Sequence, residues 1–112
     1  MIEKIVDVGK EFSERLIWRN AFQANDNINA QNFRRLFLSE LNSPEKWGKD
    51  YKIILDFSNV ETISPGFANE AFAYFAQYAK TPEELLEKIV IKNASEVKYK
   101  IILREIQSGF GL

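Results

Sequence analysis

The hydrophobic positions follow two different spacings along the chain, and the spacing separates predicted strands from predicted helices. Short apolar runs rich in β-branched residues occur at 2–8, 52–57 and 88–92, and each run predicts a strand. The run at 52–57 is almost unbroken, which is typical of a strand buried on both faces. The run at 2–8 alternates loosely, as expected at the edge of a sheet. Residues 15–20 fit either another strand or the entry to a loop.

Apolar residues at three- and four-residue spacing predict a first helix that begins after Asn29, a residue type that caps helices well. We expect Ser43 and Pro44 to end this helix. A last helix is predicted over 94–107, and Asn93 has suitable chemistry to cap it. The residues expected to face the core are Ala30, Phe33, Leu36, Phe37 and Leu41 in the first helix, and Val97, Ile101 and Ile106 in the last.

Two further helices are predicted from their start signals. Ser64 is suited to cap a helix, and Pro65 is favoured at the first helical position. The apolar stripe that follows them in the sequence continues to Ala79. The segment Thr81-Pro-Glu-Glu matches a capping box, which predicts a short helix. Residues 23–29 form a polar cluster that is typical of a turn.

Strands that alternate with helices predict an α/β fold. We expect a small sandwich in which about four strands form a mixed sheet that is covered by three to four helices. No linker rich in Pro, Gly or Ser and no internal repeat divides the sequence, so residues 1–112 are expected to form one domain.

Composition narrows the classes of function. The chain has 112 residues, a formal net charge of -1, and neither cysteine nor histidine. The lack of these two side chains removes thiol nucleophiles, disulfides, the usual zinc ligands and the commonest general base. The charge gives no reason to expect a nucleic-acid partner, and the apolar runs are too short to span a membrane. We therefore expect a cytoplasmic protein without metal or cofactor, and a binding module rather than an enzyme.

The segment between the buried strand and the second helix carries most of the candidate chemistry. Asp56 ends the strand, where it can accept hydrogen bonds from loop amides near Ser58, bind a metal or act as a base. Ser64 can cap the helix or serve as a regulatory hydroxyl. Asp56, Glu61 and Glu70 form a carboxylate site only if they converge in space.

A group of arginines forms a second candidate site, because guanidinium groups bind anions well. The group consists of Arg15, Arg19, Arg34 and Arg35, and Trp18 lies among them in the sequence. An ordinary charged surface explains the same residues. Trp18, Trp47 and Phe110 are candidate anchors for a partner, and a core position suits Trp18 equally well.

Residues 53–72 contain the segment Leu-Asp-Phe-Ser-Asn-Val-Glu-Thr-Ile-Ser-Pro-Gly-Phe followed by Ala-Asn-Glu-Ala-Phe. This segment resembles the strand, loop and helix of STAS domains, which are named after sulfate transporters and anti-sigma-factor antagonists. It is more similar to a family of small bacterial STAS-like domains of unknown function, and residues 29–37 resemble the first helix of that family. The resemblance implies a STAS-like fold and a non-enzymatic regulatory domain. It also implies a protein partner, such as an ATP-binding kinase or an anti-sigma-like protein.

In anti-sigma-factor antagonists, a serine at the start of the corresponding helix is phosphorylated, and the added charge blocks the complex. Gly66 falls on that acceptor position here, so the resemblance leaves Ser64 or Ser58 as the residue to be phosphorylated. The surface that the resemblance implies for partner binding consists of Ser58, Glu61, Ser64, Gly66, Asn69 and Glu70.

The leading hypothesis is therefore a protein–protein docking module that acts as a monomer or a weak homodimer. The alternative is a small-ligand or nucleotide sensor that uses the arginines between positions 15 and 35 as an anion site. A third hypothesis is an enzyme that relies on Asp56 and Glu61.

Overall fold

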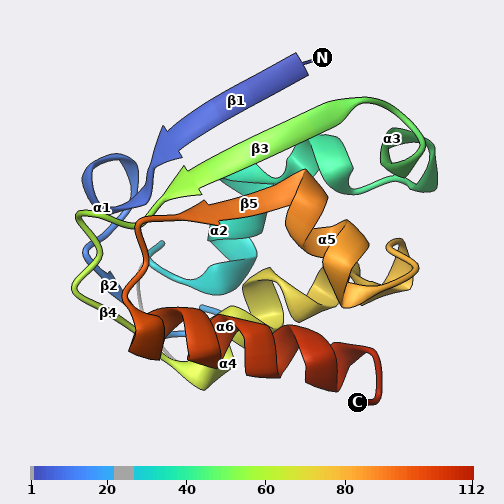
Figure 1. Ribbon diagram of the computed structural model, residues 1–112. Coiled ribbons are helices and arrows are strands. Elements are labelled where there is room, and N and C mark those ends of the chain that lie inside the picture. Colours follow the sequence, from blue (N-terminus) through green and yellow to red (C-terminus); the bar gives the residue numbers. More distant parts are fainter. Residues whose placement is uncertain (1, 22–26) are drawn as a thin grey trace.

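The main sheet contains three parallel strands in a computed structural model that describes residues 2–21 and 27–112. The strands are β1 (Ile2–Asp7), β3 (Tyr51–Asp56) and β5 (Ile89–Lys92), in the order β1-β3-β5 (Figure 1). The central position of the most apolar run and the edge position of the first run are both confirmed. Part of the polar turn predicted at 23–29 lies outside the described residues.

A second, two-stranded sheet contains β2 (Arg15–Leu16) and β4 (Thr62–Ile63), which also pair in parallel. The prediction of one four-stranded mixed sheet is therefore wrong for the described residues, although the α/β class is confirmed. In the segment 15–20, Arg15 and Leu16 form the strand, and they pair with the loop that follows β3 instead of joining the main sheet. Trp18 forms a single bridge with Asn29. Strands this short show no alternation that a sequence pattern could reveal.

The described residues form six α-helices and two 3₁₀ helices, more than the three to four helices predicted. Their bounds are α1 (Val8–Glu11), α2 (Ala30–Phe37), α3 (Pro44–Trp47), α4 (Pro65–Ala71), α5 (Pro82–Lys88) and α6 (Glu96–Gly109), with 3₁₀ helices η1 (Ser39–Leu41) and η2 (Ala73–Gln77). Pro44 thus begins the short helix α3, whereas α2 already ends at Phe37.

The helix predicted from Pro65 to Ala79 divides into α4 and η2 at Phe72. In η2 the Phe75 amide donates to the Phe72 carbonyl, and the Tyr78 amide donates to the Phe75 carbonyl, each at 3.0 Å. These bonds span three residues, so aromatic side chains three positions apart lie on one face. Phe72 and Phe75 are both buried against the core, which explains why the tighter helix replaces the α-helix here.

The predicted caps agree with the structure at three helices. Asn29, Ser64 and Thr81 each accept a hydrogen bond from a backbone amide in the first turn of the helix that follows. The fourth prediction is wrong, because Ser95 caps α6 instead of Asn93. Asn93 has a φ of 61°, a left-handed conformation that asparagine tolerates better than most residues.

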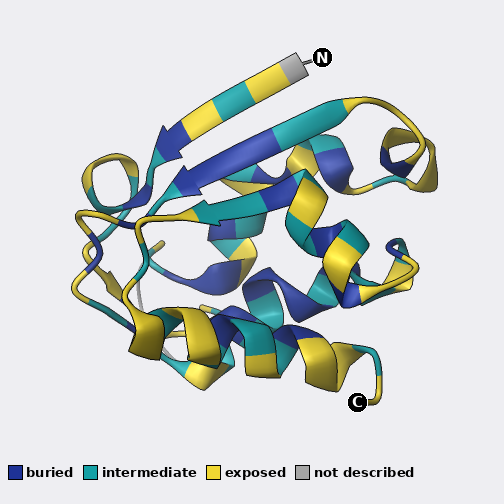
Figure 2. Ribbon diagram, in the orientation of Figure 1, coloured by how far each residue is buried: buried dark blue, intermediate teal, exposed yellow. Residues whose placement is uncertain are grey.

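The core lies between the main sheet and the helices (Figure 2). Two residues predicted to face it are exposed instead, since Leu36 is 45% exposed and Val97 is 69% exposed. Leu38, which follows α2, is fully buried. The fully buried large side chains include Phe33, Phe57, Phe67, Phe72, Phe75, Leu16, Ile53, Leu55 and Ile89.

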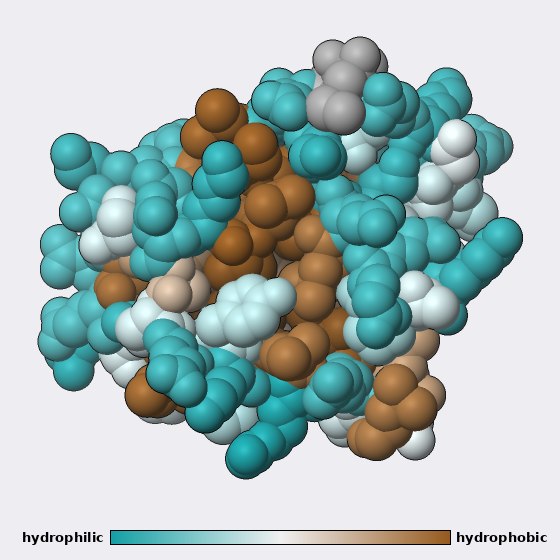
Figure 3. Space-filling model, in the orientation of Figure 1, coloured by the Kyte–Doolittle hydropathy of each residue, from teal (hydrophilic) through white to brown (hydrophobic). Residues whose placement is uncertain are grey.

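The opposite face of the main sheet carries apolar side chains at the surface. Ile5 pairs with Ile54, and Ile54 pairs with Val90, so these three side chains lie in one row on the same face. Ile5 is 68% exposed. Figure 3 shows hydrophobic side chains in a band over β1, β3 and β5.

Candidate functional site

The carboxyl end of β3 is tied to the loop that follows it. Asp56 Oδ1 accepts a hydrogen bond from the Ser58 amide at 2.9 Å and another from Asn93 Nδ2 at 3.1 Å. The Ser58 amide and then the Asn93 side chain stabilise the ionised carboxylate, which lowers the pKa of Asp56. Asp56 therefore acts as the predicted acceptor for loop amides, and it also joins the ends of β3 and β5.

The loop at 58–61 is held from two further directions. Asn59 Nδ2 donates to Asp7 Oδ2 at 2.9 Å, and the Glu61 amide donates to the Glu14 carbonyl at 2.7 Å. Gly9 lies against the same loop so closely that a Cβ atom there would be 2.1 Å from the Asn59 carbonyl oxygen. The loop backbone therefore has a defined position, while the side chains of Ser58, Asn59 and Glu61 remain exposed.

Ser64 connects this loop to α4. Its Oγ accepts a hydrogen bond from the Phe67 amide at 3.0 Å and donates one to the Ile17 carbonyl at 2.6 Å. The N-cap role is confirmed. A phosphate on Ser64 would remove the proton that Oγ donates to Ile17, so phosphorylation at this position has a structural cost.

Arg19 lies over the first turn of α4. A Cβ atom at Gly66 would be 3.1 Å from Arg19 Nε, and Arg19 Nη1 donates to Asn69 Oδ1 at 3.1 Å. The absence of a side chain at Gly66 thus makes room for the arginine. Arg19, a residue of the predicted anion group, thus lies against two residues of the predicted docking surface, Gly66 and Asn69.

Arg34 joins α2 to the end of α4. Its Nη1 donates to the Glu70 carbonyl at 3.2 Å and lies 3.5 Å from Glu70 Oε2. The guanidinium carbon is 3.8 Å from the centre of the Tyr74 ring, which is a cation–π geometry. Glu70 therefore has an internal partner and is only partly available to other molecules.

The four arginines predicted as one anion site are distributed over three places. Arg15 lines a hollow of about 450 Å³ together with Ile17 and Trp18. Arg19 lies at the start of α4. Arg34 and Arg35 line a different hollow, of about 200 Å³, between α2, η1 and η2.

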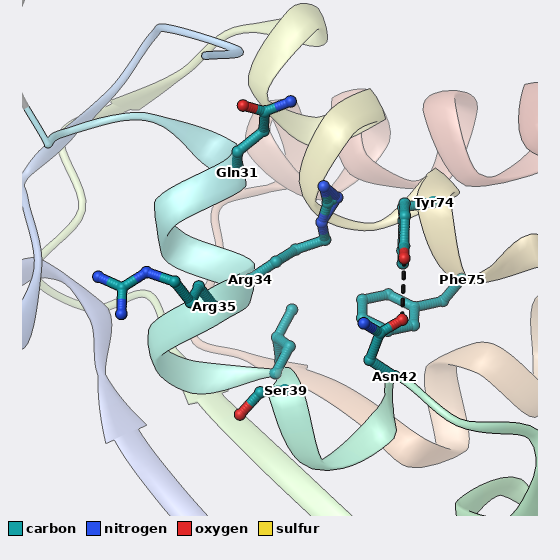
Figure 4. A pocket seen from close by; sticks show the side chains of 8 residues that line it. Gln31, Arg34, Arg35, Ser39, Asn42, Tyr74 and Phe75 are labelled. Carbon is teal, nitrogen blue, oxygen red and sulfur yellow. Dashed lines mark hydrogen bonds between the residues drawn. The ribbon is translucent and has the colours of Figure 1, made fainter. Parts of the chain in front are cut away.

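The smaller hollow contains residues that the sequence did not single out. Figure 4 shows Asn42 and Tyr74 beside it, and the Tyr74 hydroxyl donates to Asn42 Oδ1 at 2.8 Å. Tyr78 donates to the same oxygen at 3.0 Å. These residues come from segments far apart in the sequence, so no local spacing could have indicated the cluster.

The aromatic residues proposed as anchors have different surroundings. Trp47 is buried, and its Nε1 donates to the Leu41 carbonyl at 2.8 Å, so it belongs to the core. Phe110 is partly buried against the core. Trp18 is 43% exposed and remains the most accessible of the three.

The proposed carboxylate site does not assemble. Asp56 contacts Ser58 and Asn93, whereas Glu70 contacts Arg34. Among the residues that the structure describes, no group of three or more His, Cys, Asp or Glu side chains is arranged to hold a metal ion. In the same residues, no helix has both the length and the apolar character needed to cross a membrane.

Comparison with known proteins identifies the family. A family model described as a STAS-like domain of unknown function matches residues 29–98, which is more than half of the chain. The matched segment includes α2, β3, the loop at 58–61, α4 and β5. Neither the curated proteins nor the solved structures contain a match to this chain. This chain therefore belongs to the family of STAS-like domains of unknown function.

Proposed function

We propose that this protein is a non-enzymatic regulatory module that binds a partner protein through the loop at 58–61 and the start of α4. The observation that carries the proposal is the loop itself, whose backbone is fixed by bonds to Glu14 and Asp56. Its Asn59 side chain is also tied to Asp7. Its polar side chains nevertheless face outward. A surface that is already ordered loses little conformational entropy when a partner docks.

The docking surface has a centre and a margin. Ser58, Asn59 and Glu61 are exposed and form the centre. Asn69 and Glu70 are partly buried and already contact arginines, so they form the margin. Because the Glu61 carboxylate is exposed at this centre, a basic side chain of the partner is its natural complement.

The resemblance to anti-sigma-factor antagonists supports a partner of the ATP-binding kinase or anti-sigma-like class. It also supports control by phosphorylation, and Ser58 suits that role better than Ser64 does. Ser58 is exposed, whereas the Ser64 hydroxyl has two partners inside the protein. A phosphate on Ser58 would add a charge of about -1.5 to -2 near Asp56 and Glu61. This charge would repel an acidic partner surface and change the affinity for a basic one.

A pull-down from the native host tests the proposal with two charge reversals of equal size. Glu61→Arg changes the centre of the docking surface, and Glu83→Arg changes an exposed residue on α5 at the far end of the molecule (Figure 1). Phe67 is unsuitable for such a test because it is fully buried. Circular dichroism first establishes that both variants are folded.

The proposal predicts a protein that is captured by the wild type and by Glu83→Arg but lost with Glu61→Arg. Capture of the same proteins by all three forms would contradict docking at this loop. The addition of ATP and magnesium to the eluted complex then shows whether the partner is a kinase, because Ser58 would gain a phosphate detectable by mass spectrometry.

A further inference from the structure

The hollow between α2, η1 and η2 has a floor and walls of different character. Leu38 and Phe75 are buried and supply apolar contacts, whereas the Tyr74 ring and the Arg34 side chain stand beside the opening (Figure 4). Polar groups complete the lining at Gln31, Ser39 and Asn42. An apolar base with a few polar groups at the rim is the usual composition of a small-molecule site.

Arg34 is the group in this hollow that is suited to an anion. Only 17% of its side chain is exposed, and its guanidinium is held in place by the Tyr74 ring at 3.8 Å. Within residues 2–21 and 27–112, this guanidinium makes its hydrogen bond and its ion pair with Glu70 through Nη1. The Nε and Nη2 donors lie in one plane, and this edge matches the two oxygens of a carboxylate.

Arg35 contributes differently, although it lines the same hollow. Its Nε and Nη2 both donate to Asn32 Oδ1, at 3.0 Å and 2.6 Å. Figure 4 shows its guanidinium pointing away from Tyr74 and Asn42. The two neighbouring arginines therefore provide a matched pair, in which the Arg34 guanidinium lies beside Tyr74 and the Arg35 guanidinium points away.

We infer that this hollow binds a small organic carboxylate with a flat apolar ring. The ring lies on Leu38 and Phe75 beside Tyr74, and the carboxylate accepts hydrogen bonds from Nε and Nη2 of Arg34. The volume of about 200 Å³ admits a single substituted ring. For comparison, an apolar cavity of about 150 Å³ binds benzene.

The position of Arg34 links this site to α4. The same guanidinium that would bind the carboxylate contacts the Glu70 carbonyl and its side chain. A bound anion would compete with Glu70 for the Arg34 guanidinium. Occupancy of the hollow would therefore change the electrostatic environment at the end of α4. The inference about this ligand site does not rest on the docking proposal, because none of the residues that line the hollow belongs to the loop at 58–61.

An NMR titration of uniformly ¹⁵N-labelled protein tests the inference with two probes, benzoate and its neutral analogue benzamide. Benzoate is expected to shift the amide signals of Ser39, Asn42, Glu70 and Tyr74, with a dissociation constant of about 1 mM. Benzamide is expected to bind about tenfold more weakly or worse, because it lacks the charge that Arg34 pairs with.

Three variants complete the test. Arg34→Lys keeps the charge but loses the planar fork, so benzoate affinity should fall about tenfold. Arg35→Lys should leave it unchanged. Ser39→Phe narrows the opening without touching Arg34, and it should also abolish the shifts. The inference would be overturned if benzoate and benzamide bound equally well, or if the affinity for benzoate were unchanged in Arg34→Lys and Ser39→Phe. It would also be overturned if benzoate, at about ten times the expected dissociation constant, caused no localised shifts.

Discussion

The loop at 58–61 and the hollow beside Arg34 use hydrogen bonds in opposite ways. In the loop, bonds to Glu14 and Asp56 hold the backbone, Asp7 holds the Asn59 side chain, and the side chains of Ser58 and Glu61 face solvent. In the hollow, internal bonds hold side chains such as Arg34 and Tyr74 and leave a space between them. The first arrangement suits contact with the surface of another protein, and the second suits a small molecule.

The largest effect is expected from a change that displaces the loop. Gly9→Ala places a Cβ atom 2.1 Å from the Asn59 carbonyl oxygen, so the backbone of one of the two segments must move. We expect a loss of about 3 kcal/mol in the free energy of unfolding, measured by urea denaturation.

Gly48→Ala is the matched control for Gly9→Ala. Its nearest neighbour would be the Glu45 carbonyl oxygen at 3.8 Å, and the φ of Gly48 is -86°, which alanine adopts freely. This variant should be neutral or more stable by about 0.5 kcal/mol. Equal stability of the two variants would show that the loop is not held where the structure places it.

A second test removes the connection between the loop and α4. Ser64→Ala loses the cap on the Phe67 amide and leaves the Ile17 carbonyl without its donor. The expected cost is about 2 kcal/mol in the free energy of unfolding. The control is Ser95→Ala, which removes an exposed cap whose bond to the Lys98 amide is 3.3 Å long, at a cost of about 0.5 kcal/mol.

A smaller effect is expected at the hollow. Arg34→Met retains most of the aliphatic stem but removes the contacts with Glu70 and the charge above Tyr74. We expect a loss of about 1 kcal/mol in the free energy of unfolding, measured by thermal or urea denaturation. The exposed neighbour supplies the control, because Arg35→Met should change stability by less than about 0.5 kcal/mol. A larger loss in Arg35→Met would reverse the roles assigned to these two residues.

The smallest effect concerns pH. The hydrogen bonds from Ser58 and then Asn93 lower the pKa of Asp56 in the folded protein. The stabilisation they provide is therefore present above the unfolded pKa of about 3.9 and is lost as pH falls through the folded value. Wild type should have a higher urea midpoint than Asp56→Asn at pH 7, and the two midpoints should converge as the pH falls through the folded pKa of Asp56. If the difference between the two urea midpoints persisted unchanged in acid, it would have a cause other than the ionised Asp56 carboxylate.

Local signals were sufficient to predict much of this fold. The caps at Asn29, Ser64 and Thr81 depend on residues within one helical turn, so the sequence alone indicates them. The same holds for the hydrogen bond between Asp56 and the Ser58 amide. The central strand was recognisable because it is apolar on both faces.

Predictions that depended on distant partners were incomplete or wrong. The contacts of Arg34 with Glu70 and of Asn42 with Tyr74 join residues 36 and 32 positions apart, and no spacing pattern encodes them. The apolar spacing places Leu36 on the core face of the first helix, but α2 ends at Phe37, and Leu38 is buried while Leu36 is exposed. The parallel pair of β2 and β4 is too short to leave a pattern.

The central claim is that a partner protein docks at the loop at 58–61, and NMR mapping with the captured partner tests it most directly. The account predicts that the largest chemical-shift changes occur at residues 58–61, with smaller changes at Asn69 and little change on α5. Shifts centred on the exposed sheet face around Ile5, with the loop unaffected, would contradict it.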